Sequence, residues 1–522
     1  MDRRHVLRLA AATAIVGGAL AGTMAATPAQ AQARKILVVA SNQDVPNFDP
    51  HVATGYSASA FMRNLYDSLV RVEGNPVKVV PHLAQSWTVS PDGMEYTFRL
   101  DPAAKFSDGS PVMADAVVYS FQRLTRLSKG NSWMVAGIID QNSVSAVDPQ
   151  TVKIKLLKPF VAFVHVLPWL WVVNPKDVEA NKGADDGQTW LRSNVAGSGA
   201  FRIKRAEPGN LYEFEKVASP WKQGSGNLTG AIWRIIRETS NQRLALQRGE
   251  AHIAVDLTAE DMDALKDKPG VVSIIEPEFR TFSIKMNTQH GPLADLNLRK
   301  AISYAFNYKA MEESSSYQQL MVGPLPHGIF GHDPKLAVPT TDLDKAKEFL
   351  AKSKTPNGGI KLTAVHVSGL EQQRRFMLVL LDSLKKLNIE LDIKPMVWPD
   401  MVASTASPDK MADFFPVYQT ANYGDPDNIA FAAYHSSRNG NWQNPVYKSA
   451  AVDELIMRGR AETDEGKRKQ IYLDFQKQVV EDAPDIFGVL EKRKLALRSD
   501  VQGLVFTPVA SNAIEFFPLS LK

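Results

Sequence analysis

The sequence predicts a mixed α/β protein that folds into more than one lobe. Strand-like and helix-like patterns intermix along the chain without a fixed repeat, which is typical of α/β packing. The chain has 522 residues, which is longer than a domain with a single hydrophobic core normally is, so two or more lobes are expected. Its composition, 44% hydrophobic and 22% charged, is that of an ordinary soluble globular protein.

The first predicted elements are a buried strand and an amphipathic helix. Residues 35–40 form a short apolar run rich in β-branched side chains, which predicts a buried strand. After a loop, apolar residues from Phe61 to Leu69 recur at helical spacing. Residues 57–69 are therefore predicted to form a helix with one buried face.

Three turn signals follow. Residues 90–93, Ser-Pro-Asp-Gly, lie between two stretches of alternating character and predict a β-hairpin. Residues 107–111 form a second turn, after which residues 114–124 carry apolar side chains on one helical face. Residues 147–150 predict a further hairpin turn that leads into a strand over 151–157.

The rest of the chain continues the α/β pattern. The helix over 371–387 is followed directly by a strand over 388–397, which predicts a helix and a strand packed in one α/β lobe. The other predicted elements are helices over 241–249 and 296–308, two helices within 451–481, and strands over 279–286 and 486–491.

The N-terminus has the pattern of a cleavable signal peptide over residues 1–33. Arg3 and Arg4 precede a weakly apolar run over 9–26, and small residues then alternate up to Ala33. A signal peptidase would cut after Ala31 or Ala33. The run is rich in Ala, Gly and Thr, which argues for removal rather than retention as a membrane anchor.

The export route has two candidates. Consecutive arginines followed by Val6, Leu7 and Arg8 favour the twin-arginine route, and an ordinary Sec signal is the alternative. The chain has no cysteine, so the lipoprotein route is closed and a free periplasmic protein is expected.

Composition excludes several classes of function. The absence of cysteine rules out disulfides, thiolate metal sites and a cysteine nucleophile. The net charge of +4 falls to about +2 once the leader is removed, because Arg3, Arg4, Arg8 and Asp2 leave with it. Such a nearly neutral protein lacks the basic field that nucleic-acid binding requires.

No catalytic or cofactor pattern is present, so the protein is predicted not to be an enzyme and to carry no cofactor or metal. The histidines are scattered, and the nearest pair, His327 and His332, lies in a glycine-containing loop where histidines are usually solvated. The sequence around Ser198 lacks the spacing of a nucleophile elbow and instead predicts a tight turn between lobes. No phosphate-binding loop or dinucleotide fingerprint occurs.

A series of motifs resembles family 5 of the bacterial extracellular solute-binding proteins, the oligopeptide, dipeptide and nickel type. The similarity spans nearly all of the chain after the leader, in order. The motifs are Asp49-Pro-His, Leu65-Tyr-Asp-Ser-Leu, Pro81-His-Leu-Ala-Gln-Ser-Trp, Asp92-Gly-x-x-Tyr-Thr-Phe-Arg-Leu, Lys105-Phe-Ser-Asp-Gly-Ser-Pro, Ala114-Asp-Ala-Val, Gly197-Ser-Gly-Ala-Phe and Leu298-Arg-Lys-Ala-Ile-Ser-Tyr-Ala.

The resemblance implies a type II periplasmic-binding-protein fold, with two lobes, an extra inserted domain and the ligand enclosed between the lobes. Closure about a hinge near 280–286 and 491–497 would convert an open form into a closed form that an importer recognises. The implied domains are a discontinuous domain I over 34–78, 196–284 and 493–522, a hairpin-rich domain II over 79–195, and an α/β domain III over 285–492.

The resemblance also supplies candidate ligand contacts. Thr54, Gly55 and Tyr56 match the family's N-terminal ligand loop. The other positions are expected where the family usually contacts ligand, although a single tryptophan more often belongs to a core. They are Trp133, Asp256, Trp398, Gln419, Asn422, Tyr423 and Asp425.

The chain departs from the peptide-binding members at one position. Those members place an aspartate four residues before the proline equivalent to Pro426, where it pairs with the peptide's α-ammonium group, and this chain has Asn422. A neutral partner loses a charge-assisted hydrogen bond of about 1.5–3 kcal/mol. No arginine occurs at 367–369 to bind a peptide carboxylate. Asp425 could turn to bind the ammonium group in place of the missing aspartate, or its role could be structural.

The implied function is that of a periplasmic component of an ABC importer, a monomer that binds a peptide-like or other small organic solute. It would deliver this solute to an inner-membrane permease and its ATPase subunits. One alternative keeps the class but makes the ligand an unmodified di- or oligopeptide. Another is an envelope peptide chaperone or a ligand-binding protein for a chemoreceptor.

Overall fold

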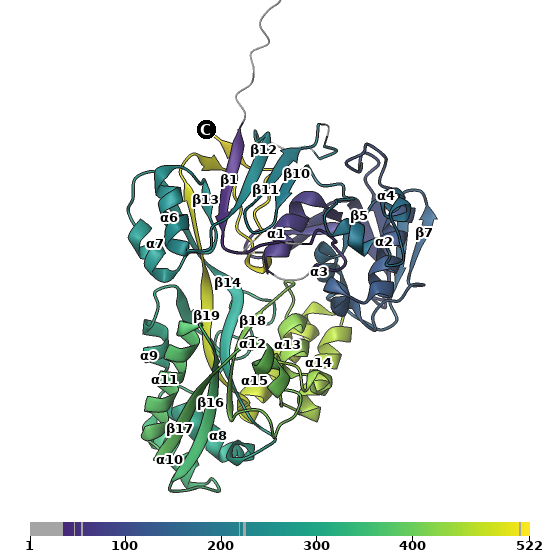
Figure 1. The fold of residues 1–522 in the computed structure, drawn as a ribbon. Coiled ribbons are helices and arrows are strands. Elements are labelled where there is room, and N and C mark those ends of the chain that lie inside the picture. The colour runs from purple at the N-terminus through teal and green to yellow at the C-terminus, as the bar shows by residue number, and fades with distance from the viewer. Residues whose placement is uncertain (1–34, 46, 54–55, 219, 223–225, 511–512) are drawn as a thin grey trace, which may run out of the picture. The chain divides into compact units, whose positions relative to one another are not determined.

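One large β-sheet runs through the protein and carries most of the other elements (Figure 1). The computed structural model describes residues 35–45, 47–53, 56–218, 220–222, 226–510 and 513–522, without the side chains of Tyr56, Ser57 and Ala510. The predicted signal peptide therefore lies outside the described residues. The sheet has 11 strands in the order β10-β11-β12-β1-β13-β19-β14-β18-β16-β17, with β15 paired to β19.

The N-terminal half of this sheet is built around the predicted first strand. β1 (Ile36–Ser41) pairs in parallel with β12 (Gly230–Ile235) on one side and with β13 (Ile253–Ala254) on the other. The antiparallel hairpin of β10 (Phe201–Glu207) and β11 (Leu211–Lys216) extends it.

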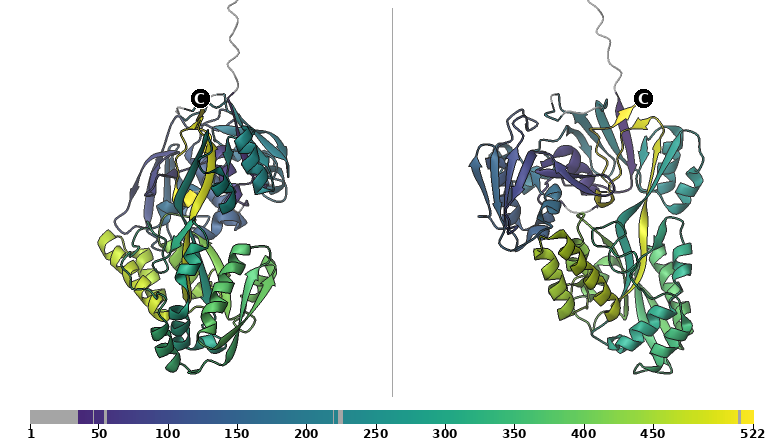
Figure 2. Two further views of the ribbon diagram at one scale, coloured as in Figure 1. Left: turned by 90° about the vertical axis from the view of Figure 1, so that its left-hand side faces the viewer. Right: turned by 180° about the vertical axis from the view of Figure 1, so that it is seen from behind.

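Two long antiparallel strands join this half to the other. β14 (Val271–Met286) and β19 (Asp485–Arg498) pair along most of their lengths and lie side by side in every view (Figures 1 and 2). Their pairing shifts between Pro277 and Thr281. The far half continues through β18 (Phe414–Thr420), β16 (Ile360–Val367) and β17 (Ile389–Met396), with β15 (Gln318–Leu320) beside β19.

Helices cover both halves of the sheet. Beside the N-terminal half lie α1 (Tyr56–Leu65), α6 (Thr239–Arg248) and α7 (Ala259–Leu265). The far half carries α8 (Leu296–Ala305), α9 (Tyr308–Glu313), α10 (Leu343–Ala351), α11 (Glu371–Lys385), α12 (Trp398–Ser404), α13 (Asp427–Tyr434), α14 (Ala450–Ala461) and α15 (Glu465–Asp482). None of the helices within the described part of the chain combines the length and apolar character needed to cross a bilayer.

A smaller antiparallel sheet is formed by the predicted hairpins. β5 (Ala84–Val89), β6 (Glu95–Leu100), β8 (Thr151–Lys155) and β7 (Val144–Asp148) pair in that order, and α2 (Ala114–Leu127) packs against them. The short elements around them are α3 (Phe163–Val166), α4 (Pro175–Ala180) and α5 (Gln188–Leu191), with the strand pairs β2 (Asp67–Ser68) and β9 (Trp171–Val172), β3 (Val70–Glu73) and β4 (Lys78–Pro81), and β20 (Val501–Gln502) and β21 (Ser520–Leu521).

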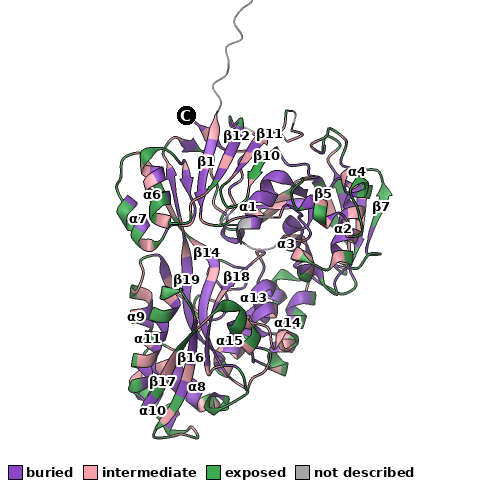
Figure 3. Ribbon diagram, in the orientation of Figure 1, coloured by how far each residue is buried: buried purple, intermediate pink, exposed green. Residues whose placement is uncertain are grey.

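The buried residues of the sheets and helices, purple in Figure 3, include the apolar residues that form the cores. Under α1, Phe61 is fully buried, and its ring lies 5.0–5.3 Å from the rings of Tyr212, Phe214 and Trp233. In the far half, the Phe282 ring lies 4.6 Å from that of Phe376. Such burial of aromatic rings supplies much of the stability of each half.

The predicted helix over 57–69 is wrong at its C-terminal end, because α1 stops at Leu65. Tyr66 donates its hydroxyl to the carbonyl of Phe48 at 2.9 Å, and Asp67 is drawn into β2 as a buried carboxylate. These tertiary contacts override the helical spacing, which continues to Leu69 only in the sequence.

The predicted helix over 296–308 is in fact two helices. Phe306 adopts an extended conformation with φ −64° and ψ 134°, which ends α8. Asn307 then caps α9, its side-chain oxygen accepting a hydrogen bond from the Ala310 N–H at 3.0 Å. The two long strands also exceed the ranges 279–286 and 486–491, because the outer end of β14 is mostly exposed and a charged run, 492–494, interrupts the apolar pattern of β19.

A buried ion pair ties the loop after β1 to α2. Arg123 donates from Nη1 and Nη2 to the two carboxylate oxygens of Asp49 at 2.9 and 2.6 Å, and both side chains are fully buried. His51 lies in the same cluster, its Nδ1 3.0 Å from Arg123 Nη1 and its Nε2 2.9 Å from the carbonyl of Trp171. Burial, followed by the charge of Arg123, lowers the pKa of His51 from 6.5 to about 4.

We expect Asp49→Asn to destabilise the protein by about 3–5 kcal/mol, because it leaves the Arg123 guanidinium buried without its counter-charge. Urea unfolding at pH 7 measures this. Asp392→Asn is the matched control, since Asp392 belongs to an exposed pair with Lys394 and its removal should change stability by less than about 1 kcal/mol. Equal effects of the two substitutions would contradict the structural role of the buried pair.

We also expect His51 to make the protein sensitive to acid. Its pKa is lower in the folded than in the unfolded state, so the unfolded state binds more protons below pH 6.5. Stability should fall between pH 6.5 and 4, with up to about 3 kcal/mol due to this residue. Unfolding of His51→Gln should show a shallower pH slope than the wild type, whereas His290→Gln, at an exposed position, should keep the wild-type slope.

Candidate functional site

The segment after β18 holds three of the predicted ligand contacts, Asn422, Tyr423 and Asp425, and its backbone is held at several points. The Ala421 N–H donates to the carbonyl of Phe279 on β14 at 2.7 Å. The Asn422 N–H donates to Oδ1 of Asn428 at 3.0 Å, and the Asp427 N–H donates to Oδ1 of Asp425 at 3.0 Å, where α13 begins. The segment is therefore a fixed loop between the long strand pair and α13.

Successive residues of β18 face opposite sides of the sheet. Tyr418 packs against Phe282 on β14, their rings 5.0 Å apart. Gln419 points the other way, and its Nε2 donates to the carbonyl of Gln443 at 3.1 Å. Trp442 directly precedes Gln443 in the chain, and its ring lies 5.5 Å from that of Trp398. The structure thus associates Trp398 and Gln419 through the segment at 442–443.

A cavity of about 380 Å³ lies on the Tyr418 side, and we call it the Asp256 cavity. Asp256 is held by its own half of the protein, accepting hydrogen bonds from Ser41 Oγ at 2.6 Å and from the Asn42 N–H at 2.9 Å. The residues that line the Asp256 cavity come from the loops after β1 and β13, from β14, β18 and β19, and from the start of α11. They are Gln43, Val255–Leu257, Glu278, Arg280, Gly369–Gln372, Tyr418, Glu491, Arg493 and Lys494.

The charges in the Asp256 cavity are organised around Arg280. Its Nε lies 3.0 Å from Oε2 of Glu491, and its guanidinium lies 4.7 Å from the centre of the Tyr418 ring. Burial, followed by the negative charge of Glu491, raises the pKa of Tyr418 well above 10. The Tyr418 hydroxyl therefore remains a hydrogen-bond donor at any physiological pH.

A second cavity, of about 500 Å³, contains Asp425, and we call it the Asp425 cavity. The buried Asp425 carboxylate accepts a hydrogen bond from Arg468 Nη2 at 2.7 Å. Burial acts to lower the pKa of Arg468, and Asp425 more than offsets this, so the guanidinium stays charged. The other lining residues are Pro76, Val77, Val161, His165, Phe279, Gly328–Phe330, Gly424, Thr463, Glu465 and Arg468.

A third cavity, of about 300 Å³, brings Trp133 and Tyr423 together. Trp133 is 40% exposed, which fits a wall of a site better than a core position. The Tyr423 hydroxyl donates to Oδ2 of Asp427 at 2.8 Å, and Arg460 lies 3.4 Å from the other oxygen of that carboxylate. Burial raises the pKa of Asp427, against the opposing charge of Arg460.

The predicted contacts thus fall into separate groups rather than one pocket. Trp133 and Tyr423 share a cavity, and Trp398 and Gln419 share a neighbourhood. Asp256 and Asp425 line different cavities, and Asn422 lies in the loop between β18 and α13. Thr54 and Gly55 lie outside the described residues, as does the side chain of Tyr56, which begins α1.

Sequence reasoning missed the residues that balance the site's charges. Arg468 on α15 and Arg460 on α14 look like ordinary charged residues of helices in the sequence. Nothing local marks them as partners of Asp425 and Asp427. Tyr418 and Arg280 could have been found, because each lies in or next to a segment already predicted to be part of the site or the hinge.

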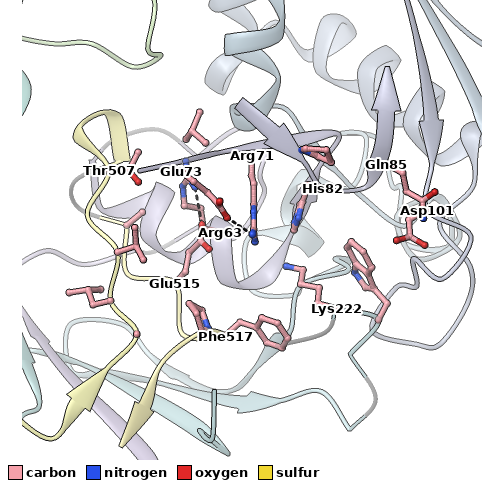
Figure 4. A pocket seen from close by; sticks show the side chains of 18 residues that line it. Arg63, Arg71, Glu73, His82, Gln85, Asp101, Lys222, Thr507, Glu515 and Phe517 are labelled. Atoms are coloured by element: carbon pink, nitrogen blue, oxygen red, sulfur yellow. Dashed lines mark hydrogen bonds and ion pairs between the residues drawn. The ribbon is translucent and has the colours of Figure 1, made fainter. Parts of the chain in front are cut away.

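A further cavity, of about 600 Å³, contains none of the predicted contacts (Figure 4). Its charges compensate one another, because Arg63 pairs with Glu515 at 2.9 Å and Arg71 pairs with Glu73. Lys222 pairs with Asp67, and the two line a smaller cavity that shares Lys222 with this one. The lining residues are Arg63, Arg71–Glu73, Pro81, His82, Gln85, Asp101, Trp221, Lys222, Gly503–Val505, Thr507, Ala513, Glu515, Phe517 and Pro518.

The chain is similar to known binding proteins along nearly its whole length. A family model described as "Bacterial extracellular solute-binding proteins, family 5 Middle" matches residues 78–441. The "Probable D,D-dipeptide-binding periplasmic protein DdpA" of Escherichia coli is 29% identical over 497 residues, covering 93% of this chain and 94% of DdpA. The glutathione-binding protein GsiB of Pectobacterium atrosepticum is 25% identical over 508 residues, covering 95% of this chain and 96% of GsiB.

Solved structures show the same fold. DppA from Helicobacter pylori, an ABC transporter-associated periplasmic binding protein solved with the peptide STSA, superposes with a TM-score of 0.78. It is 25% identical, and the match covers 94% of this chain and 98% of DppA. HbpA2 from Haemophilus parasuis gives a TM-score of 0.83 at 23% identity, covering 93% of this chain and all of that chain.

These matches confirm the predicted α/β class and identify it as the type II periplasmic-binding-protein fold. The family is one of binding proteins rather than of enzymes, and its members serve ABC importers. The family model covers more than half of the chain's length, so the chain belongs to family 5 of the bacterial extracellular solute-binding proteins. It acts as the solute-binding component of an ABC importer.

Proposed function

We propose that the protein binds a peptide-like or other small organic solute that does not present a free α-ammonium group at Asn422. The relatives support a peptide-like solute, since DdpA is named for D,D-dipeptides, GsiB for glutathione, and DppA was solved with a peptide. The solute would be captured in the periplasm and handed to an inner-membrane permease with its ATPase subunits. The protein would be exported through the twin-arginine or Sec route, cleaved near Ala31 or Ala33, and monomeric.

The charge balance around Asn422 carries this proposal. Asn422 offers an amide where the peptide-binding members of the family have a carboxylate. The two carboxylates that follow are already engaged, Asp425 by Arg468 at 2.7 Å and Asp427 by Arg460 at 3.4 Å. Turning Asp425 toward an ammonium would leave Arg468 buried without its partner, which is costly. An amine placed here would therefore meet a neutral amide.

The proposed closure mechanism uses the two long strands. The division into domain I over 34–78, 196–284 and 493–522, domain II over 79–195 and domain III over 285–492 would place boundaries on β14 and β19. Bending at the irregular pairing near Pro277 to Thr281 would move the two halves of the site together. The Asp256 cavity, lined from both halves, would change most on closure.

The first test is native mass spectrometry of the mature protein purified from its own periplasm, followed by denaturation to identify any small molecule that co-purifies. A solute without a free α-amine supports the proposal. A bound peptide with a free α-amine contradicts it and favours the alternative of an unmodified peptide importer. Loss of import of the identified solute when the adjoining permease is deleted would separate an importer from an envelope chaperone or chemoreceptor protein.

We expect Asn422→Asp to increase the affinity for a free-amine dipeptide by about 10- to 100-fold, because the new carboxylate forms a charge-assisted hydrogen bond worth about 1.5–3 kcal/mol. Calorimetric titration measures this. The N-acetylated form of the same dipeptide should gain nothing, and Asn357→Asp, at an exposed position, should not change either affinity. No gain for the free amine would mean that position 422 does not face the amine end of a ligand.

We expect Trp398→Ala to weaken solute binding by roughly tenfold while leaving the fold intact, because the ring is 40% exposed and meets the Trp442 ring edge-on at 5.5 Å. Affinity for the co-purified solute and a far-ultraviolet circular dichroism spectrum measure the two effects. Val397→Ala, at the exposed neighbouring position, is the control. Unchanged affinity in Trp398→Ala would remove this residue from the site.

A further inference from the structure

The third cavity of the candidate site, which we call the Trp133 cavity, lies where the segments beside the small antiparallel sheet meet α13 and α14. On one side, Trp133 belongs to a short 3₁₀ helix (Gly130–Val135), and Lys158 follows β8. On the other side, Phe431 is on α13 and Arg460 is on α14. The volume of about 300 Å³ is at the lower end of ligand pockets in proteins. It suits a small molecule or one end of a larger solute.

The two sides touch directly beside this cavity. The Val161 N–H donates to the carbonyl of Arg460 at 2.9 Å. The Arg460 guanidinium lies 4.7 Å from the centre of the Phe160 ring and 4.1 Å from that of the Phe431 ring, and Phe160 is fully buried. Arg460 is thus held between a residue of the small-sheet side and a residue of α13. The Trp133 cavity is therefore lined by two parts of the protein that meet at a defined junction.

The charged residues at the Trp133 cavity have one sign. Of the described Asp, Glu, Lys and Arg residues, three line it, and all three are cationic: Lys158, Arg438 and Arg460. Lys158 and Arg438 have no ion-pair partner within the part of the chain that the structure describes, although Arg438 is half-buried. A partly desolvated cation is stabilised by an anion, so this cavity favours a negatively charged group.

The carboxylate next to Arg460 does not cancel this charge. Asp427 accepts a hydrogen bond from the Tyr423 hydroxyl at 2.8 Å, and its other oxygen lies 3.4 Å from Arg460 Nε. Asp427 does not line the cavity, and its negative charge is shared with Arg460. The charges of Lys158 and Arg438 are therefore left for a ligand.

The remaining walls offer a donor and apolar surface. Asn428 lines the cavity and is 2% exposed. Its Oδ1 accepts from the Asn422 N–H at 3.0 Å, and its Nδ2 has no hydrogen-bond partner among the described residues. A ligand oxygen placed beside this amide would satisfy the buried donor. Trp133 and Met457, which are 40% and 44% exposed, add apolar surface that a ligand could cover.

We propose that the Trp133 cavity binds an anionic group of the solute, a carboxylate attached to an apolar or aromatic body. Arg438 and Lys158 bind the carboxylate, and Trp133 and Phe431 pack against the body. This assignment rests on the proposed function and narrows it to a solute that presents no α-ammonium group at Asn422 and carries an acid. Because the walls come from both sides of the junction, the bound acid also favours the state in which these sides are together.

Fluorine NMR titration of the solute-free mature protein with 4-fluorobenzoate at pH 7.5 tests the proposal. This probe is a small aromatic carboxylate without an amine. The wild type should bind it saturably at millimolar concentrations, and at least tenfold more tightly than the uncharged 4-fluorobenzamide, because only the carboxylate forms charge-assisted hydrogen bonds. Absence of saturable binding, or equal affinity for the two probes, would overturn the proposal.

Substitutions locate the binding. Arg438→Gln and Lys158→Gln should each weaken 4-fluorobenzoate binding about tenfold. Arg458→Gln removes the same charge from an exposed residue of α14 and should leave the affinity unchanged. Ala136→Trp, at an exposed lining position, fills the cavity and should abolish binding with the wild-type melting temperature, and Ala351→Trp on α10 is its control. Wild-type affinity in Ala136→Trp or in the double variant Arg438→Gln/Lys158→Gln would contradict the assigned site.

The identity of the co-purified solute separates this assignment from the proposed function. A solute with an acidic group and without a free α-amine supports both. A solute that has neither group leaves the proposed function in place and overturns the anionic site. A solute with a free α-amine contradicts the proposed function, and the 4-fluorobenzoate titration then decides the anionic site by itself.

Discussion

The antiparallel pairing of β14 with β19 is the constraint on which the rest of the molecule depends. These two strands carry the sheet from its N-terminal half to its far half, and residues on them and on neighbouring segments line the Asp256 cavity. Where their register shifts, Phe279, Arg280 and Glu491 leave the regular ladder and line the cavities. A break in regular pairing at such a place re-aims side chains without ending the sheet. The same irregularity thus supplies side chains that line two cavities, and it is the point of bending in the proposed closure.

Buried charges in this protein are matched within the fold. Asp49 with Arg123, Asp425 with Arg468, and Lys285 with Asp485 at 2.7 Å are all nearly or wholly removed from solvent. Such pairs add little net stability compared with apolar packing, but breaking one leaves an uncompensated charge. They therefore fix which segments lie together. The carboxylates that look most like ligand anchors in the sequence, Asp425 and Asp427, are also paired, with Arg468 and Arg460, and Asn422 in the same loop carries no charge.

Local patterns predicted much of the fold but little of the site. The turn at 90–93, the strand at 35–40 and the helix at 371–387 depend on neighbouring residues, and each was predicted close to its observed position. The end of α1 could not be predicted, because Asp67 is drawn into β2 by partners as distant as Ser198 and Lys222. The family resemblance named plausible contacts, yet it could not show that Arg468 lies against Asp425 or that Arg63 meets Glu515 across 452 residues. Those relations exist only in three dimensions.

The alternation along β18 has a consequence for how such a protein could change during evolution. Tyr418 faces the cavity that contains Asp256, and Gln419 donates to the carbonyl of Gln443, the residue after Trp442, although Tyr418 and Gln419 are adjacent in the chain. Substitutions on one face leave the contacts of the other unaltered, since the backbone between them is fixed by the sheet. If both faces belong to the proposed site, two parts of a ligand would therefore be recognised by independently variable sets of residues. During evolution, such a protein could keep its binding of one end of a solute while its specificity for the other end changes.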